Sequence, residues 1–159
     1  MKLASLLTPK QVILDLKGEV CNEAISSIIG HLISNGLLAK GLKDEVLLAL
    51  KEREQEISTG IGSGVAIPHA FSDSVDQVVA AFARSKEGVD FESLDNAPVN
   101  FVILFIVPKK DYSLHLQTLA AIARMFNNCE VRQQLHAAET IENVLDIFAS
   151  RPSRIHSEK

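Results

Sequence analysis

The sequence has only two cysteines, and they lie far apart. Cys21 and Cys129 show no metal-ligand spacing, and each falls in or beside a predicted helix. This pattern argues against a disulfide framework and against a cysteine-based metal site. We therefore expect two reduced thiols without a chemical role.

Long hydrophobic runs are also missing. The longest, Phe101 to Val107, is far too short to cross a bilayer as a helix. The N-terminal segment “MKLASLLTPKQVILDLKG” has only a short, interrupted apolar patch, which differs from a secretory signal peptide. We expect a cytoplasmic protein with no membrane insertion.

The chain has no excess of positive charge. Its 16 Lys and Arg residues stand against 20 Asp and Glu residues, for a formal net charge of −4, and the basic residues are scattered. A nucleic-acid-binding protein needs a basic patch to neutralise phosphates. The sequence therefore predicts no nucleic-acid partner.

No internal repeat, low-complexity tract or Pro/Gly/Ser linker divides the 159 residues. A hydrophobic content of 47% with 23% charged residues is typical of a folded chain and argues against disorder. We expect a single domain over residues 1–150, followed by a flexible tail over residues 151–159.

Helical spacing of apolar residues predicts helices in both halves of the chain. In the first half, one helix is expected to start at Asn22 as N-cap and to end at Gly36, and a second to begin near Asp44. In the second half, one is expected to start at Ser113 as N-cap and to turn five residues towards the core, namely Leu116, Leu119, Ala120, Ala123 and Phe126. Two shorter helices are expected around 130–137 and 140–149.

Three segments are predicted to be strands, over residues 65–67, 77–85 and 99–107. The last is apolar at consecutive positions, which indicates a central strand covered on both faces. Strands separated by helices predict an α/β fold, with helices packed on a mixed sheet.

Glycine and histidine are concentrated in the stretch “STGIGSGVAIPHA”. His69 follows the first predicted strand, and a neutral imidazole can attack a phosphoryl group at physiological pH. Gly60, Gly62, Ser63 and Gly64 could let the backbone approach a phosphate closely. A flexible turn and a chance surface histidine are the alternatives, and neither a P-loop lysine nor a dinucleotide-type helix follows.

His115 lies in the first turn of the helix that follows the central strand. The positive end of the helix dipole favours a neutral imidazole there, and the neutral ring could donate a hydrogen bond to a phosphate on His69. A surface histidine is the alternative. Arg53 could contact phosphate oxygens or could simply be solvated. His31, His136 and His156 are assigned no role.

The segment “REQEISTGIGSGVAIPHA” resembles the phosphorylation-site signature of the fructose/mannitol-type (type 2) EIIA domains of the bacterial phosphoenolpyruvate-dependent phosphotransferase system. “LDNAPVNFVILFIVP” and “HLQTLAAIARMF” are also similar to this family, and “HLQTL” is closest to its nitrogen-regulatory EIIA-Ntr branch. The resemblance extends from “LLTPKQVILDLKG” to “AAETIENVLDIF”. Ala70 replaces the commoner glycine after the histidine.

The resemblance implies an α/β sandwich with a central mixed sheet of about five strands flanked by helices. It also implies that His69 is phosphorylated on Nε2 while the backbone holds Nδ1, that His115 supports the phosphate, and that Arg53 lies near the site. The donor would be the phosphocarrier HPr or its nitrogen-branch counterpart NPr, and no cofactor would be needed. The acceptor would be an EIIB cysteine in a sugar-transport EIIA, or regulatory target proteins in the nitrogen branch.

Other functions remain open from the residues alone. A metal-dependent hydrolase could use His69, His115 and either Asp73 or Asp111 as ligands, although no close ligand pair is present. A regulatory binding module could have lost phosphotransfer. For the phosphocarrier, we expect an apolar rim that docks its partner, formed by Ile61, Val65 and Phe71.

Overall fold

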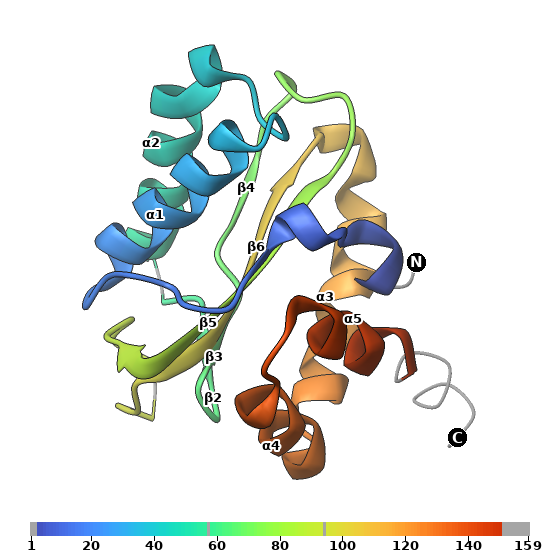
Figure 1. The fold of residues 1–159 in the computed structure, drawn as a ribbon. Helices are drawn as coiled ribbons and strands as arrows, with labels where there is room; N and C mark the ends of the chain where they lie inside the picture. Colours follow the sequence, from blue (N-terminus) through green and yellow to red (C-terminus); the bar gives the residue numbers. More distant parts are fainter. Residues whose placement is uncertain (1–2, 57, 94, 151–159) are drawn as a thin grey trace.

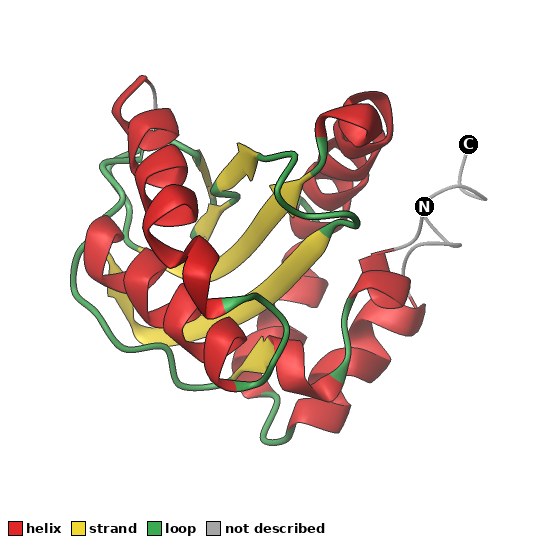
Figure 2. Cartoon of the chain, turned by 90° about the horizontal axis from the view of Figure 1, so that it is seen from above, coloured by secondary structure: helices red, strands yellow, loops and turns green. Residues whose placement is uncertain are grey.

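One sheet separates two layers of helices in the computed structural model, which describes residues 3–56, 58–93 and 95–150. Helices α1 and α2 cover one face, and α3, α4 and α5 lie on the other (Figures 1 and 2). Within the described residues, no helix has the length and apolar character needed to cross a membrane. The expected tail over residues 151–159 lies outside the described residues.

The sheet contains six strands: β1 Val12–Ile13, β2 Gly60–Gly62, β3 Val65–Ala66, β4 His69–Phe71, β5 Val79–Val89 and β6 Val99–Val107. Their order is β1-β5-β6-β3-β2, and β4 also pairs with β6. Both β3 and β4 run parallel to β6, in register with its first and second halves, so they share one edge of it. The six strands therefore occupy five positions, which confirms a mixed sheet of about five strands.

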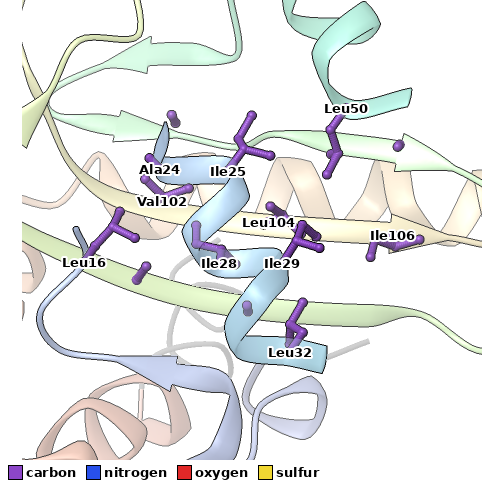
Figure 3. Close-up of a cluster of buried hydrophobic side chains, with 14 of the residues drawn as sticks. Leu16, Ala24, Ile25, Ile28, Ile29, Leu32, Leu50, Val102, Leu104 and Ile106 are labelled. Carbon is purple, nitrogen blue, oxygen red and sulfur yellow. The ribbon is translucent and has the colours of Figure 1, made fainter. Parts of the chain in front are cut away.

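The central strand β6 is buried on both faces, as its apolar run predicts. Phe101, Ile103 and Phe105 face α3 to α5, while Val102, Leu104 and Ile106 face α1 and α2. Figure 3 shows the second set packed against isoleucines of α1. Because successive side chains alternate between faces, one strand contributes to both cores.

Helix α1 covers Cys21–Ser34 and α2 covers Lys43–Glu56. The prediction of Asn22 as N-cap is wrong, because Val20 occupies the cap position and the Glu23 carboxylate accepts the backbone N–H groups of Glu19 and Val20. The predicted end is confirmed: Gly36 adopts φ +73°, and the N–H of Leu37 bonds the carbonyl of Leu32.

On the other face lie α3 Tyr112–Phe126, α4 Cys129–Ala137 and α5 Ile141–Ser150. The expected inward face of α3 is largely wrong, because three of the five predicted residues, Leu116, Ala120 and Ala123, are exposed. His115, Thr118 and Ile122 are buried instead. Because His115 and Thr118 are polar but face inward, the apolar residues alone predict an inward face that is displaced by one position. The N-cap is Asp111 rather than Ser113.

Four short 3-10 helices complete the fold: Leu3–Leu6, Pro9–Gln11, Lys40–Leu42 and Lys109–Asp111. The Gln11 side chain is buried and donates to the carbonyls of Leu6 at 2.7 Å and Ala80 at 2.6 Å. It therefore ties the N-terminal segment to β5.

A buried arginine ties α4 to the sheet. Arg84 of β5 is only 3% exposed, and its guanidinium donates to the backbone carbonyls of Leu135 at 2.8 Å, Ala138 at 2.6 Å and Leu14 at 3.2 Å. Carbonyls at the C-terminal end of a helix lack intrahelical partners, so the guanidinium both caps α4 and fixes its position.

Candidate functional site

His69 is the first residue of β4 and lies in register with Phe105 of β6. The sequence predicts a histidine just beyond a strand, whereas the structure makes it part of the next short strand. Pro68 separates β3 from β4 because proline has no N–H to give to a ladder. The carbonyl of Pro68 still accepts the N–H of Phe105 at 3.0 Å. The imidazole is thus fixed directly to the sheet and is half-buried.

The backbone holds one ring nitrogen of His69. Nδ1 lies 2.9 Å from the carbonyl oxygen of Ile67, and a carbonyl can only accept, so Nδ1 carries the proton. In the neutral ring the lone pair then resides on Nε2. The geometry therefore leaves Nε2 as the nucleophilic nitrogen.

His115 lies beside His69. The two ring centroids are 5.0 Å apart with the rings tilted by 53°. His115 is only 3% exposed, so the alternative of a surface histidine is wrong. Phe71 and Phe105 each place a ring 5.4 Å from it, and its buried Nε2 has no hydrogen-bond partner among the described residues. A buried, unsatisfied ring nitrogen beside a second histidine is suited to bind an incoming polar group.

Both histidines favour the neutral form. Burial, together with the nearby His69, lowers the pKa of His115 to about 4. Burial also lowers the pKa of His69, and the positive charge of Arg53 acts in the same direction. The hydrogen bond to Ile67 and the charge of Glu54 oppose these effects on His69. At pH 7 both rings are therefore uncharged, chiefly because they are desolvated.

Arg53 is in the last turn of α2 and is half-buried. Its positive charge contributes to lowering the pKa of His69. A role for Arg53 in binding an anion beside His69 stays a prediction.

The glycine-rich segment forms the β2–β3 hairpin. Gly62, Ser63 and Gly64 all adopt left-handed backbone conformations, with φ of +94°, +57° and +78°, as a tight hairpin turn requires. Gly60 is needed for a different reason, because a Cβ there would lie 2.1 Å from the Ser93 hydroxyl oxygen. Each of these glycines is therefore explained by the local backbone conformation or by a close neighbouring side chain.

This turn is not brought to His69. The carbonyl of Gly64 accepts the N–H of Phe101, four residues before Phe105 on β6, so the two places are separated by roughly 13 Å along the strand. Figure 1 shows the hairpin and β4 at different heights of the sheet. The turn residues Gly62, Ser63 and Gly64 of the expected phosphate cradle therefore lie away from the histidine, whereas Gly60 pairs with Ala66, three residues before His69.

The expected apolar rim needs a similar correction. Val65 is only 1% exposed and belongs to the core, while Ile61 is exposed on the hairpin. Phe71 is half-buried and packs against Tyr112 with ring centroids 5.3 Å apart. The large exposed apolar side chains on α3 are Tyr112 and Leu116, one turn apart. The sequence-based prediction turns Leu116 towards the core.

The ligand set of the hydrolase alternative does not assemble. Among residues 3–56, 58–93 and 95–150 there is no group of three His, Cys, Asp or Glu side chains that could hold a metal ion. Asp73 is engaged by Lys109, whose backbone N–H it accepts at 3.1 Å and whose Nζ lies 4.0 Å away. Asp111 stands at the start of α3.

Sequence reasoning missed the residues that support this arrangement. The Glu54 carboxylate accepts both the backbone N–H of Thr59, at 3.0 Å, and its hydroxyl. The carbonyl of Thr59 in turn accepts the N–H of Ile67 at 3.0 Å. Only the motif position of Glu54 gave any signal, since neither residue lies near a histidine in sequence.

The resemblance to EIIA domains implies that His69 and His115 lie together, and their ring centroids are 5.0 Å apart. The family model described as “Phosphoenolpyruvate-dependent sugar phosphotransferase system, EIIA 2” matches residues 5–151. The chain therefore belongs to the EIIA 2 family and is a component of a phosphotransferase system.

Similar proteins include both a sugar-specific EIIA component and nitrogen regulatory proteins. The chain is 42% identical to the PTS system fructose-specific EIIA component of Haloferax volcanii over 107 residues, which cover 67% of this chain and 70% of that protein. It is 28% identical to the nitrogen regulatory protein of Bradyrhizobium diazoefficiens over 153 residues, which cover 96% and 98% of the two chains. The first has the higher identity and the second the fuller coverage.

Solved structures show the same fold. The crystal structure of the nitrogen regulatory protein IIA-Ntr from Neisseria meningitidis has a TM-score of 0.83 at 29% identity, covering 92% of this chain and 98% of that one. The crystal structure of IIA mannitol from Escherichia coli has a TM-score of 0.75 at 22% identity, covering 89% and 98%. The α/β sandwich is therefore shared by both branches.

Proposed function

We propose that the protein is a phosphoryl carrier that accepts a phosphoryl group onto Nε2 of His69. The observation that carries the proposal is the pairing of His69, with Nδ1 held by the backbone, and a buried neutral His115 at 5.0 Å. The donor would be a phosphohistidine on HPr or on its nitrogen-branch counterpart NPr. An activated phosphoramidate of this kind needs no metal in the proposed step.

The proposed step balances as follows. The Nε2 lone pair of His69 attacks phosphorus in line, the N–P bond of the donor breaks, and the bonding electrons return to the donor nitrogen. The donor leaves as a neutral imidazole that keeps the proton on its other nitrogen. His69 keeps its Nδ1 proton on the Ile67 carbonyl.

The neighbouring groups have separate proposed tasks. His115, neutral and without a partner at its buried Nε2, would donate a hydrogen bond to a phosphoryl oxygen. Arg53 would stabilise the charge on the other oxygens from the end of α2. The ring of His115 lies 5.0 Å from that of His69, which supports a direct contact with the transferred group.

The test is to incubate the protein with the phosphorylated donor system and to measure its intact mass. We expect wild type and His31→Ala to gain one phosphoryl group and His69→Ala to gain none. His31 is the matched control, since its ring Nε2 contacts the carbonyl of Lys10 elsewhere on the molecule. A His69→Ala protein that still gains the group would overturn the assignment, as would an unmodified wild type.

For the output, we propose the nitrogen-regulatory type, in which phosphorylation alters binding to target proteins. The near-complete match to nitrogen regulatory proteins and the TM-score of 0.83 to IIA-Ntr support it. Binding of targets should then differ between His69→Ala and His69→Asp, since the latter adds a negative charge. Identical binding by the two variants would count against regulation.

The second candidate is a sugar-transport EIIA that passes the group to an EIIB cysteine. The 42% identity to a fructose-specific EIIA component favours it. Mixing the phosphorylated protein with a fructose EIIB domain separates the two functions. Stoichiometric loss of the phosphoryl group to the EIIB cysteine would establish transport, and retention would support the regulatory type.

A further inference from the structure

We propose that Glu54 and Thr59 are positioning residues that fix the orientation and tautomer of His69 through a chain of hydrogen bonds starting at α2. The inference deepens the proposed function, since it concerns how the phosphoryl-accepting nitrogen is presented. Neither Glu54 nor Thr59 is proposed to touch the transferred phosphoryl group.

The first link is a bidentate contact. One carboxylate oxygen of Glu54 accepts the N–H of Thr59 at 3.0 Å, and the other accepts its hydroxyl. Thr59 is only 4% exposed. A charged acceptor bound twice by one buried residue fixes that residue firmly relative to the helix.

The second link extends the β2–β3 hairpin towards the histidine. The carbonyl of Thr59 accepts the N–H of Ile67 at 3.0 Å, beyond the last paired residues of the two strands. Ile67 lies between β3 and β4, and Pro68 after it has no N–H and bonds β6 through its carbonyl alone, which accepts the N–H of Phe105. The position of the Ile67 backbone therefore depends on Thr59.

The third link reaches the ring. The Ile67 carbonyl lies 2.9 Å from Nδ1 of His69 and holds the proton there. If this carbonyl shifts, the ring can rotate, and part of the population moves its proton to Nε2. That tautomer has no lone pair on Nε2 and cannot attack phosphorus.

The chain is distinct from the through-space effect of the Glu54 charge, which raises the pKa of His69 while Arg53 lowers it. Thr59→Val removes the hydroxyl link and leaves all charges in place. Any effect of Thr59→Val on His69 therefore comes from a change in the position of the Ile67 backbone and not from a change in charge.

The experiment combines phosphorylation rates with ¹⁵N NMR of the His69 ring, measured at one temperature on those variants that are folded. Thr59→Val should lower the second-order rate constant of phosphorylation roughly 5-fold, and Glu54→Ala, which removes both bonds, roughly 20-fold. The two ¹⁵N shifts should approach each other as the tautomers mix. Thr59→Ser should restore both properties, and the exposed Glu52→Ala in the same helix should behave as wild type.

Unchanged rates and ¹⁵N shifts in Thr59→Val would overturn the proposal. The comparison of Thr59→Val with Thr59→Ser is sufficient for this decision even when Glu54→Ala does not fold. A variant that is merely destabilised would lose melting temperature without a change of tautomer, which also contradicts the proposal. Failure of wild type to accept a phosphoryl group would instead overturn the proposed function, and the ring spectra would still decide the positioning.

Discussion

His115 is a buried residue with a titratable ring, and its burial lowers the free energy of unfolding by an amount that depends on pH. The ring contacts Phe71 and Phe105, and its Nε2 has no hydrogen-bond partner in the part of the chain that the structure describes. Protonation would place a charge in this apolar surrounding, so the ring stays neutral far below the usual pKa of histidine. The buried ring therefore makes the stability of the folded chain depend on pH.

Replacing His115 should therefore flatten the pH dependence of stability. Above pH 6.5 the ring is neutral in both the folded and the unfolded chain. Between 6.5 and about 4 only the unfolded chain takes up the proton, so the free energy of unfolding falls as the pH falls, by at most about 1.4 kcal/mol per pH unit. Below about 4 both forms are protonated. His115→Phe removes this contribution.

The measurement is urea unfolding of wild type and His115→Phe between pH 7.5 and 4. We expect a shallower slope for the variant below pH 6.5 and parallel behaviour above it. Some slope remains, because burial also lowers the pKa values of His69 and His136. Identical slopes would show that His115 titrates normally.

At the scale of elements, the β2–β3 hairpin illustrates where the sequence misleads. Glycine clusters suit both phosphate loops and tight turns, and spacing alone does not separate them. The positive φ angles identify a tight turn, and contacts such as the hydrogen bond from the Ser63 N–H to the Asp95 carboxylate at 3.1 Å hold it in place. The hairpin serves the fold, and it also carries Thr59 at its base.

Gly64→Ala should lower stability without slowing phosphorylation. Gly64 has φ +78°, and an added Cβ would lie 3.2 Å from the Asn100 side-chain oxygen, so we expect a loss of about 1–2 kcal/mol. Thermal and urea unfolding measure the loss, and the mass assay measures phosphorylation. Gly30→Ala is the matched control: nothing lies within 4 Å of its added Cβ inside α1, so a gain of about 0.5–1 kcal/mol is expected. A slower phosphoryl transfer in folded Gly64→Ala would restore the phosphate-cradle hypothesis.

For the molecule as a whole, the sequence predicts the α/β class, the central strand β6 and all five α-helices to within a few residues. It misses β1, β2 and β4, which have two or three residues each and are stabilised by pairing partners distant in sequence rather than by local preference. The phase of α3 fails because His115 and Thr118 are polar residues on a buried face. His69 and His115 could be found from motifs, whereas the support by Glu54 and Thr59 exists only once the chain is folded.

Arg84 connects distant parts of the molecule, since from β5 it binds both the N-terminal segment and the end of α4. Arg84→Met keeps the length of the side chain and leaves buried carbonyls of Leu135 and Ala138 without a donor. We expect a loss of about 2–4 kcal/mol in urea unfolding. Lys86→Met, exposed on the same strand, should change stability by less than about 0.5 kcal/mol. Equal effects of the two variants would contradict the role of Arg84 as a connector.

The attachment of His69 to the sheet also sets a condition for every encounter. A ring on a strand, with Nδ1 held by the carbonyl of Ile67, has less freedom to swing outward than a loop residue. For the proposed exchange of a phosphoryl group, the partner must therefore bring a protruding atom down to the surface, and turnover should be limited by how quickly the two proteins meet and separate rather than by movement within this one.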